Sequence, residues 1–444
     1  MSYDDHISKP LTVRAIKARY YLITFLVWFA TALPLALMVL LAQARGLSLA
    51  QVGFALGAYS LCVVLLEVPT GGLADAVGRR RVALLAFTLA ALYSLAFLFA
   101  FSFPALLAAM LLYGVSRALS SGALDAWFID ALQAADPAVD LQPALAGGET
   151  VSLLALGAGT VIGGALPGLF PGLPADGAAV LTPLAVPLAA SLAVKLALVA
   201  AVALLIPDDR PAAGASWRAG FRAVPGLVRS AVALSRANRR LVLLMLASFV
   251  AGFAIVSLEA FWQPFFAALP GVSGANGAPP NALLLGVIMA GNFLIGAGGN
   301  LLSAPLTRRL GGRRALVAGL ARLAQGASIL ALAASAALVP ATGFFWLAYL
   351  MGAVGLSPHA TLVNEEIPAD RRSAMLSVQS LAAYLGGFLG GAGLGYVADH
   401  LSISLAWVIA AALTLASVAP YLLLERKRAS TDYADYTDFS EASL

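Results

Sequence analysis

Charged residues are scarce in this chain of 444 residues, since Asp, Glu, Lys and Arg together make up only 11% of it. Ordinary soluble domains carry about 25%. Hydrophobic residues account for 61% of the chain, and the mean hydropathy is +0.90. This composition excludes an ordinary soluble protein and predicts one that crosses a membrane many times, with lipids as its surroundings.

Cysteine is almost absent, because Cys62 is the only one and no disulfide can form within the chain. The phosphate-binding pattern G-x-x-x-x-G-K-[ST] is missing, so we expect no ATP hydrolysis by this chain. Metal-ligand spacings, a dinucleotide motif and nucleophile–base signatures are missing as well. We therefore expect no metal, no cofactor, no catalytic residue and no enzymatic activity.

Apolar runs of roughly 20 residues, the length that a bilayer-spanning helix needs, recur along the chain. They lie at about 18–42, 51–70, 82–103, 105–131, 149–169, 186–207, 241–268, 283–306, 315–338, 343–363, 374–396 and 403–424. The sequence therefore predicts an all-α membrane protein with twelve transmembrane helices. The stretch 208–240 separates two sets of six, and its basic residues alternate with apolar ones, as in an amphipathic surface helix or a solvated linker.

Positive charge is distributed unevenly between the two sides of these spans. If the N-terminus is cytoplasmic, 23 of the 27 Lys and Arg residues lie in cytoplasmic segments, and only Arg45 lies in an external loop. Arg117, Lys195 and Arg322 fall inside apolar runs. Because cytoplasmic loops are enriched in Lys and Arg, we expect a multi-pass protein of the cell membrane with both termini in the cytoplasm. The net charge of +5 lies in these loops and gives no indication of a nucleic-acid partner.

The loop between the second and third runs carries a dense motif. Its pattern G-x-x-x-D-x-x-G-R-R is formed by Gly71, Asp75, Gly78, Arg79 and Arg80. Glycine reaches the positive-φ geometry that a short turn can need, and the Asp75 carboxylate can pair with an arginine. This motif resembles the signature loop of the major facilitator superfamily of secondary transporters. Gly312, Arg313 and Arg314 echo it between the eighth and ninth runs, where Arg309 stands in place of the aspartate.

The resemblance covers about residues 15–424 and implies a fold of two pseudo-symmetric six-helix bundles that alternate in access. The expected parts are an N-terminal segment (1–17), a first bundle (18–207), a central loop (208–240), a second bundle (241–424) and a polar, disordered tail (425–444). The resemblance also implies a cytoplasmic gate in which Asp130 pairs with Arg79. By analogy, Glu365 or Glu366 would pair with Arg313 or Arg314.

Ionisable side chains inside membrane spans are costly, which makes each a candidate for function. Glu67, Asp125 and Glu259 are the candidates for carrying a proton. Glu67 is equally well explained as a partner of Arg117. In the fourth run Arg117, Ser121 and Asp125 follow one another at four-residue spacing, which would place them on one face of a helix.

The seventh run carries a second polar face. Glu259, Trp262, Gln263 and Phe266 stand at helical spacing, and a carboxylate beside aromatic rings suits an organic cation or a transferable proton. The same residues would also fit at the external membrane interface, where Trp is common. Arg117, Ser121 and Asn292 complete the candidates for a substrate cavity.

A glycine cluster in the fifth run gives a weaker resemblance to proton-driven exporters. Those proteins carry G-P-x-x-G-G, and here Gly159, Gly163 and Gly164 match while Thr160 replaces the proline. Small residues also simply allow close helix packing. We expect a monomeric transporter that exports lipophilic or cationic organic compounds in exchange for protons. The alternatives are proton-coupled uptake of a small organic anion through Arg117 and Lys195, and a membrane receptor or scaffold that does not transport.

Overall fold

The computed structural model describes residues 11–71, 73–120, 122–207, 238–273, 280–367 and 372–425, together with Gly226 and Arg229. Within these residues, the side chains of 68–69, 71, 74–75 and 372–378 are not described. All regular secondary structure in the described part is helical, so the prediction of an all-α protein is confirmed. The surface helix considered for 208–240 and the tail after Glu425 lie outside the described residues.

The helices follow the predicted apolar runs closely. The first half contains α1 (Val13–Ala32), α2 (Met38–Ala44), α3 (Leu49–Gly71), α4 (Leu73–Val77), α5 (Arg79–Leu98), α6 (Phe103–Ser120), α7 (Ala123–Ala135), α8 (Leu141–Ala165), the 3₁₀ turns η1 (Leu166–Leu169) and η2 (Pro183–Ala185), and α9 (Val186–Leu205). The second half contains α11 (Arg239–Ala267), α12 (Ala282–Arg309), α13 (Arg314–Ala333), α14 (Leu338–Glu365), α15 (Arg372–His400) and α16 (Ile403–Ala416). In the described residues, 11 helices are long and apolar enough to cross a membrane. The remaining predicted span is the first, which is divided between α1 and α2.

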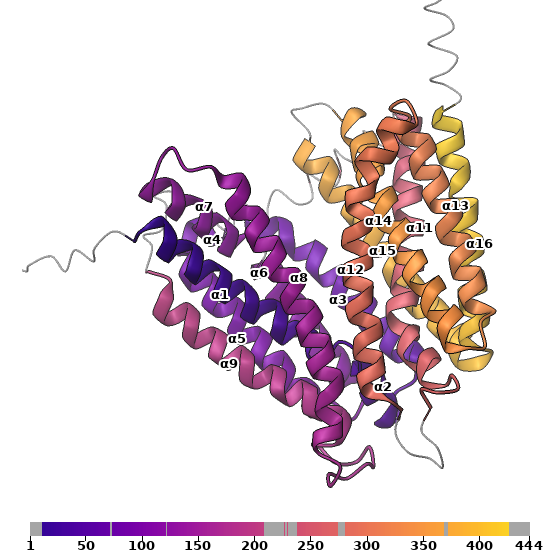
Figure 1. Ribbon diagram of the computed structural model, residues 1–444, viewed down its shortest axis with the longest axis horizontal. Coiled ribbons are helices and arrows are strands. Elements are labelled where there is room, and N and C mark those ends of the chain that lie inside the picture. Colours follow the sequence, from indigo (N-terminus) through magenta and orange to yellow (C-terminus); the bar gives the residue numbers. More distant parts are fainter. Residues whose placement is uncertain are drawn as a thin grey trace, which may run out of the picture.

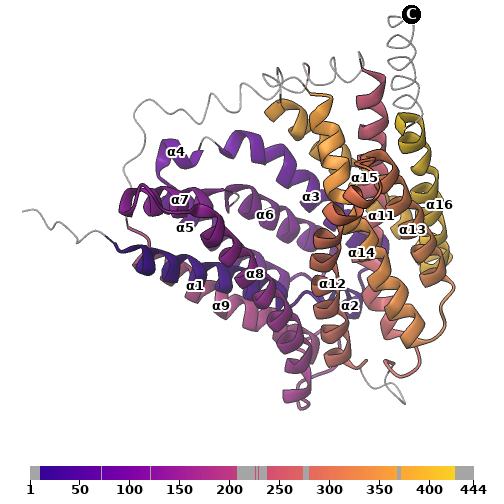
Figure 2. The same cartoon turned by 45° about the horizontal axis from the view of Figure 1, so that its top comes forward.

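The two halves form separate helical bundles that meet at one end and diverge at the other (Figures 1 and 2). One large apolar core at the converging end joins residues of both halves, from Ala36 to Leu188 and from Ala254 to Ala411. Towards the diverging end each bundle has a core of its own. We call these the narrow end and the wide end. Leucines such as Leu204 and Leu301 are largely exposed on the outer surface, where lipid would cover them.

Glycines bring the two bundles into contact along α3 and α15. A Cβ atom added to Gly53 would collide with the backbone carbonyl of Gly391, and one added to Gly57 would meet Phe388. A second contact joins α8 and α12, where Gly164 lies against Gly286. Small residues allow helices in a membrane to approach this closely. The glycine cluster of the fifth run is thus a packing surface.

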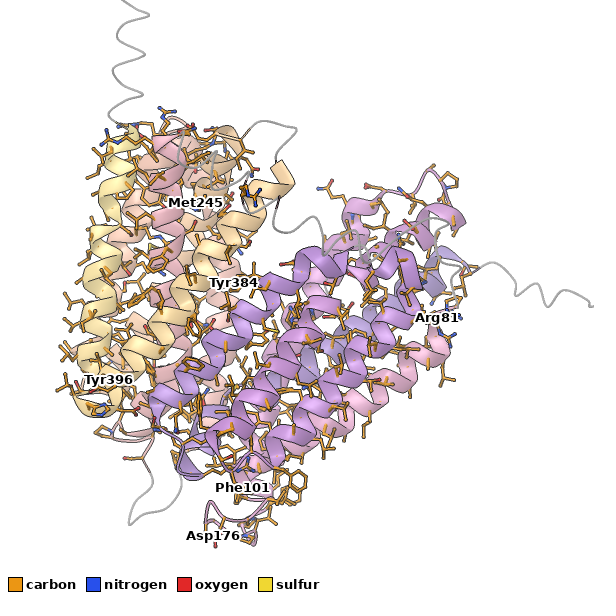
Figure 3. The ribbon with its side chains drawn as sticks, turned by 180° about the vertical axis from the view of Figure 1, so that it is seen from behind. Arg81, Phe101, Asp176, Met245, Tyr384 and Tyr396 are labelled. Atoms are coloured by element: carbon orange, nitrogen blue, oxygen red, sulfur yellow. The ribbon has the colours of Figure 1, made fainter. Side chains whose placement is uncertain are left out.

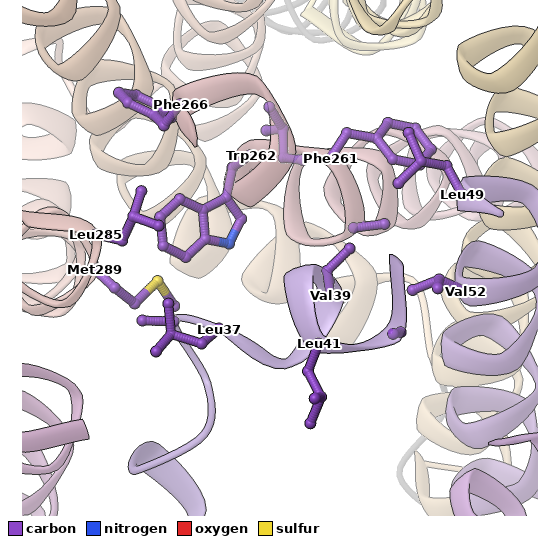
Figure 4. Close-up of a cluster of buried hydrophobic side chains, with 14 of the residues drawn as sticks. Leu37, Val39, Leu41, Leu49, Val52, Phe261, Trp262, Phe266, Leu285 and Met289 are labelled. Carbon is purple, nitrogen blue, oxygen red and sulfur yellow. The ribbon is translucent and has the colours of Figure 1, made fainter. Parts of the chain in front are cut away.

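The first span is interrupted between Leu33 and Leu37, and Pro34 lies in the interruption. Proline lacks an N–H group and clashes with the preceding helical turn, which explains why α1 ends there. The Gln263 side chain of the other bundle bridges the gap, because its amide nitrogen donates to Leu35 O at 2.9 Å and its oxygen accepts from Val39 N at 2.9 Å. Figure 4 shows this segment packed beside Trp262.

The fourth span is interrupted as well, which corrects one prediction. The helix stops at Ser120 and restarts at Ala123, and Gly122 adopts a left-handed conformation with φ of +79°. Arg117 and Asp125 therefore do not lie on one continuous helix, and Ser121, the third residue of the predicted face, lies outside the described residues. The prediction of a positive φ for Gly78 is confirmed, since its φ is +105°. The loop before it contains the short helix α4.

Arg45 is buried at the narrow end, with its guanidinium 4.6 Å from the centre of the ring of Phe101, which is labelled in Figure 3. Its guanidinium donates to Phe97 O at 2.6 Å, Leu98 O at 2.9 Å and Val180 O at 3.3 Å. Burial lowers the pKa of Arg45, and the carbonyl groups at the end of α5 compensate because helix C-termini favour cations. Arg45 thus ties α2, α5 and the loop before η2 together.

Asp399, near the end of α15, closes the narrow end from the other bundle. Its two carboxylate oxygens accept from Leu49 N at 2.8 Å and Ala50 N at 2.7 Å at the start of α3. A carboxylate at a helix N-terminus is favoured both by these orphan N–H groups and by the helix dipole. This contact exists only while the narrow ends of the bundles are together.

Asp399→Ala should weaken closure of the narrow end by about 1 kcal/mol, since a partly exposed charged hydrogen bond is lost, and so raise the population of the open form about fivefold. Spin labels on cysteines placed at Ala44 and Leu401, both exposed there, in a Cys62→Ser background would report a longer distance. Asp399→Asn keeps one acceptor oxygen and should give a smaller change. An unchanged distance distribution in Asp399→Ala would refute this role.

Candidate functional site: a central cavity between the bundles

A cavity of about 340 Å³ lies between the two bundles, next to the interruption of the first span. Its size falls within the range of small-molecule sites, about 300–1,000 Å³. The N-terminal bundle contributes Trp28, Tyr59, Tyr93, Tyr113 and Lys195, and the C-terminal bundle contributes Glu259, Trp262, Gln263, Met289 and Phe293. Aliphatic residues such as Leu35, Met38 and Leu156 complete the lining, which is therefore mainly apolar and rich in aromatic rings, with one cationic and one anionic side chain on opposite bundles.

Glu259 presents its carboxylate to this cavity and is exposed within it. No hydrogen bond or ion pair joins it to any other described residue. The predicted polar face is present in part, because Trp262 and Gln263 line the cavity beside Glu259. Phe266 does not, since it is fully buried and packs against Trp262 and Phe345. An uncompensated carboxylate at this depth can be neutralised by a proton or by a bound cation.

Lys195 lies on the opposite wall and is only 3% exposed. Its Nζ donates to Ser94 Oγ at 2.7 Å and lies 4.8 Å above the centre of the Tyr93 ring. Tyr93 stacks on Tyr113 with ring centres 4.3 Å apart, and Tyr113 stacks on Tyr59 at 5.0 Å. Aromatic faces attract cations, so these rings hold the ammonium group where no described carboxylate pairs with it.

Arg117 and Asp125 lie in a different place. They line a pocket of about 180 Å³ inside the N-terminal bundle, towards the wide end, together with Tyr20 and Glu149. The Arg117 guanidinium lies 5.2 Å from the centre of the Trp28 ring, and Trp28 lines both this pocket and the central cavity. The polar groups of the fourth span thus stand beside the central cavity and not in it.

The remaining candidates are scattered. Glu67 is exposed, lines neither of these two sites and forms no ion pair with Arg117 or any other described residue. Asn292 is buried, and its Oδ1 has no hydrogen-bond partner among the described residues. The buried His359 forms hydrogen bonds through both ring nitrogens, with the hydroxyls of Ser248 at 2.8 Å and Tyr421 at 2.9 Å.

Ion pairs cluster at the wide end of each bundle. Arg79 pairs with Asp130, and Arg80 donates to Ala203 O at 2.5 Å. In the other bundle Arg314 pairs with Glu365. The other two residues expected to pair there have different partners: Arg313 pairs with Glu425, and Glu366 pairs with Arg240. Each pair lies within one bundle, so none of them bridges the two bundles. The side chain of Asp75 lies outside the description.

Sequence reasoning missed several of these groups. Glu149 stands at the edge of a predicted run and was not distinguished from loop residues. Tyr59, Tyr93 and Tyr113 lie in three different spans, so nothing in local spacing connects them. A tyrosine in the middle of an apolar run is the signal that could have found them, because a buried hydroxyl usually needs a partner.

Two bundles of membrane-spanning helices around a central, mainly apolar cavity are the architecture of a membrane transporter. The family model of the Major Facilitator Superfamily matches residues 20–391 and 281–438. The chain therefore belongs to the Major Facilitator Superfamily. None of the curated proteins gives a significant sequence match to it.

Several solved transporters share the fold. The nucleoside transporter NupG has a TM-score of 0.74 at 16% identity, over 92% of this chain and 98% of that one. A POT family transporter in complex with a thioalcohol-conjugated peptide has 0.69 at 11%, over 93% and 96%. The human organic anion transporter MFSD10 (TETRAN) has 0.57 at 19%, over 92% and 99%. At these identities the likeness shows the fold alone.

Gln263→Leu should destabilise the protein by about 2 kcal/mol, because it leaves Leu35 O and Val39 N without partners in an apolar setting. Gln263→Glu keeps the acceptor for Val39 N but replaces the donor to Leu35 O with a charge, so we expect a comparable loss. Thermal unfolding in detergent measures both. Gln325→Leu, which removes a buried glutamine in the interior of the same bundle that accepts from Arg322, is the control.

A labelling experiment separates a local effect from a general one. A cysteine at Leu35 in a Cys62→Ser background should react faster with maleimide in Gln263→Leu and not in Gln325→Leu. Equal reactivity in all variants would mean that Gln263 does not hold the interruption of the first span.

Proposed function

We propose that this protein is a secondary transporter that exchanges protons for an amphipathic organic cation, with Glu259 as the shared site. One observation carries the proposal: a carboxylate that has no hydrogen-bond or ion-pair partner among the described residues is exposed in a cavity whose other walls are mainly apolar and carry six aromatic side chains. Aromatic faces and a carboxylate together form a favourable environment for an organic ammonium group. The chemistry of the cavity therefore supports an organic cation as the substrate class.

A single carboxylate can couple two fluxes because it cannot hold a proton and a substrate cation at once. When the cavity faces the side of higher proton concentration, protonation releases the cation. When it faces the other side, the carboxylate loses its proton and binds the next cation. Coupling of this kind needs no second site, provided that the protein changes its side of access only slowly while the carboxylate is empty and ionised. This is expected, because an uncompensated charge in a low-dielectric setting is costly.

The arrangement of the bundles supports export. The narrow end is closed by Asp399 and by the glycine contacts, while the bundles diverge at the end that carries Arg79–Arg81 and Arg308–Arg314 (Figure 1). The positive-inside rule assigns this basic end to the cytoplasm. In this conformation the cavity would receive substrate from the cytoplasm. The ion pairs of Arg79 and Arg314 would rearrange when the wide end closes.

Glu259→Gln should abolish the dependence of cation binding on pH. In the unaltered protein a lipophilic ammonium compound should stabilise the fold more at pH 8 than at pH 5.5, because only the ionised carboxylate attracts it. A tenfold difference in affinity corresponds to about 1.4 kcal/mol of stabilisation, which thermal unfolding with and without the compound resolves.

The matched control is Glu67→Gln, which removes a carboxylate that is exposed outside the cavity. It should leave both binding and its pH dependence intact. When the compound is added outside proteoliposomes that contain the purified protein, their lumen should become more alkaline, because protons leave in exchange for the cation. Proteoliposomes with Glu259→Gln should show no such change. Retained proton movement in Glu259→Gln would refute the proposal, and so would loss of pH dependence in Glu67→Gln alone.

Lys195 supports a second candidate, transport of an organic anion. It is the cationic group of the cavity wall and has no carboxylate partner among the described residues. The human organic anion transporter MFSD10 (TETRAN) shares the fold, which is compatible with an anionic substrate.

Lys195→Met keeps most of the apolar stem and removes the charge. If anions are the substrates, an aromatic carboxylate should stabilise the unaltered protein, and this effect should be lost in Lys195→Met but kept in Glu259→Gln. If cations are the substrates, Lys195→Met should bind them as well as or better than the unaltered protein, since a repelling charge is gone.

A further inference from the structure

The loops at the narrow end of the N-terminal bundle expose a group of large apolar side chains. Leu169 is 70% exposed and Phe99 is 57% exposed, each at the point where a span gives way to a loop. In the two segments concerned, 95–103 and 166–185, the only charged residue is Asp176. An exposed apolar patch of this kind usually marks an interaction surface. We call it the narrow-end patch, and it consists of Phe99, Phe101, Leu169, Phe170, Val180 and Leu181.

The parts of the patch lie side by side, because Arg45 joins the segments that carry them. Its Nη2 donates to both Leu98 O and Val180 O, which places the loop before η2 beside the end of α5. The ring of Phe101 lies over the same guanidinium, and η1 packs against η2. Figure 3 shows Phe101 and Asp176 at the same end of the bundle. The patch is therefore one surface.

The loop that carries most of the patch is fastened to the helices behind it. The backbone of Gly177 lies so close to Ala44 O that an added Cβ atom would collide with it. The bond from Arg45 to Val180 O holds the same loop further along the chain. These contacts fix the backbone of the loop on α2 and α5. The outward position of its apolar side chains is therefore a property of the fold.

Two stripes of exposed apolar residues on the outer surface of the bundle lead into the patch. Along α5 the exposed Leu92 and Leu95 are followed by Phe99 at helical spacing. Along α8 the exposed Ile162 is followed seven residues later by Leu169. Residues three, four and seven apart share one face of a helix. The lipid that covers the outer faces of α5 and α8 would therefore continue over the patch without a break.

The backbone of the loop determines the depth of such a contact. Residues 170–182 form no helix, and a lipid-exposed backbone of this kind does not occur among the lipid tails, because its polar groups would lack partners there. The boundary between headgroups and tails offers water to the backbone and apolar tails to the side chains. Asp176 is exposed in the same loop, and its charge fits the water side of this boundary.

We propose that the narrow-end patch is inserted into the membrane leaflet on its own side, at the boundary between lipid headgroups and tails. None of its six residues lines the central cavity, so the proposal is independent of the exchange at Glu259. Because Arg45 connects the patch to α2 and α5, insertion would hold this corner of the N-terminal bundle at a fixed depth while the bundles move.

Quenching of a fluorescent label by lipid tests the proposal in proteoliposomes of the full-length protein. Single cysteines in a Cys62→Ser background are labelled with bimane and reconstituted with or without a phosphatidylcholine that carries a nitroxide near the headgroup end of one tail. Phe170→Cys and Leu181→Cys report on the patch. Leu204→Cys, at a position that is 82% exposed on α9, is the control for lipid contact. Asp176→Cys, exposed in the same loop, is the control for water contact.

The nitroxide lipid should quench the labels at Phe170 and Leu181 about threefold more strongly than the label at Asp176, and nearly as strongly as the label at Leu204, since only the former positions would touch lipid tails. Iodide in the water should give the reverse order. Quenching by lipid that is no stronger at Phe170 and Leu181 than at Asp176 would overturn the proposal. A cross-link between two copies through Phe170→Cys, without quenching by lipid, would also overturn it, because a second copy would then cover the patch. If Phe170→Cys fails to fold, Leu181→Cys decides the question.

Discussion

The close approach of α3 to α15 through glycine is the constraint on which the rest of the structure depends. Helices in a membrane gain little from hydrophobic burial and associate by packing and hydrogen bonds, so backbone contact at Gly53 and Gly391 is a large share of what joins the two bundles. The contact lies towards the narrow end, and the bundles diverge beyond it. The cavity of Glu259 is the space that this divergence leaves, and the carboxylate of Asp399 seals the opposite side.

The polar groups are sorted by bundle. The C-terminal bundle brings to the cavity a carboxylate that has no partner among the described residues, whereas the N-terminal bundle brings an ammonium group held over tyrosine rings. The N-terminal bundle keeps its own carboxylates apart, behind Trp28 and Arg117. This separation prevents Asp125 and Lys195 from neutralising each other. It leaves Glu259 as the carboxylate whose charge a ligand in the cavity would compensate.

The sequence was informative where a single property dominates. Hydropathy located the spans, and the pattern around Gly78 indicated both the family and a positive φ that the structure contains. It was misleading where a helix breaks, because the periodicity around Arg117 continues across Gly122 although the helix does not. Partners distant in sequence were also out of reach: no local pattern links Gln263 to Leu35, Asp399 to Leu49, or the tyrosines of three spans to Lys195. For Glu365 and Glu366 the sequence allowed either partner, and only geometry separates them.

The amide of Gln263 has a mechanical consequence. It fastens both edges of the gap in the first span to the opposite bundle, and α2 packs against α11. Residues 33–44 are thus fastened to the second half of the chain by that amide and to the first half by Arg45, which follows α2 and donates to the carbonyl groups at the end of α5. A separation of the bundles at the narrow end must break one of these two attachments. The middle of the first span is therefore shared by the two bundles, although it belongs to the first half of the sequence.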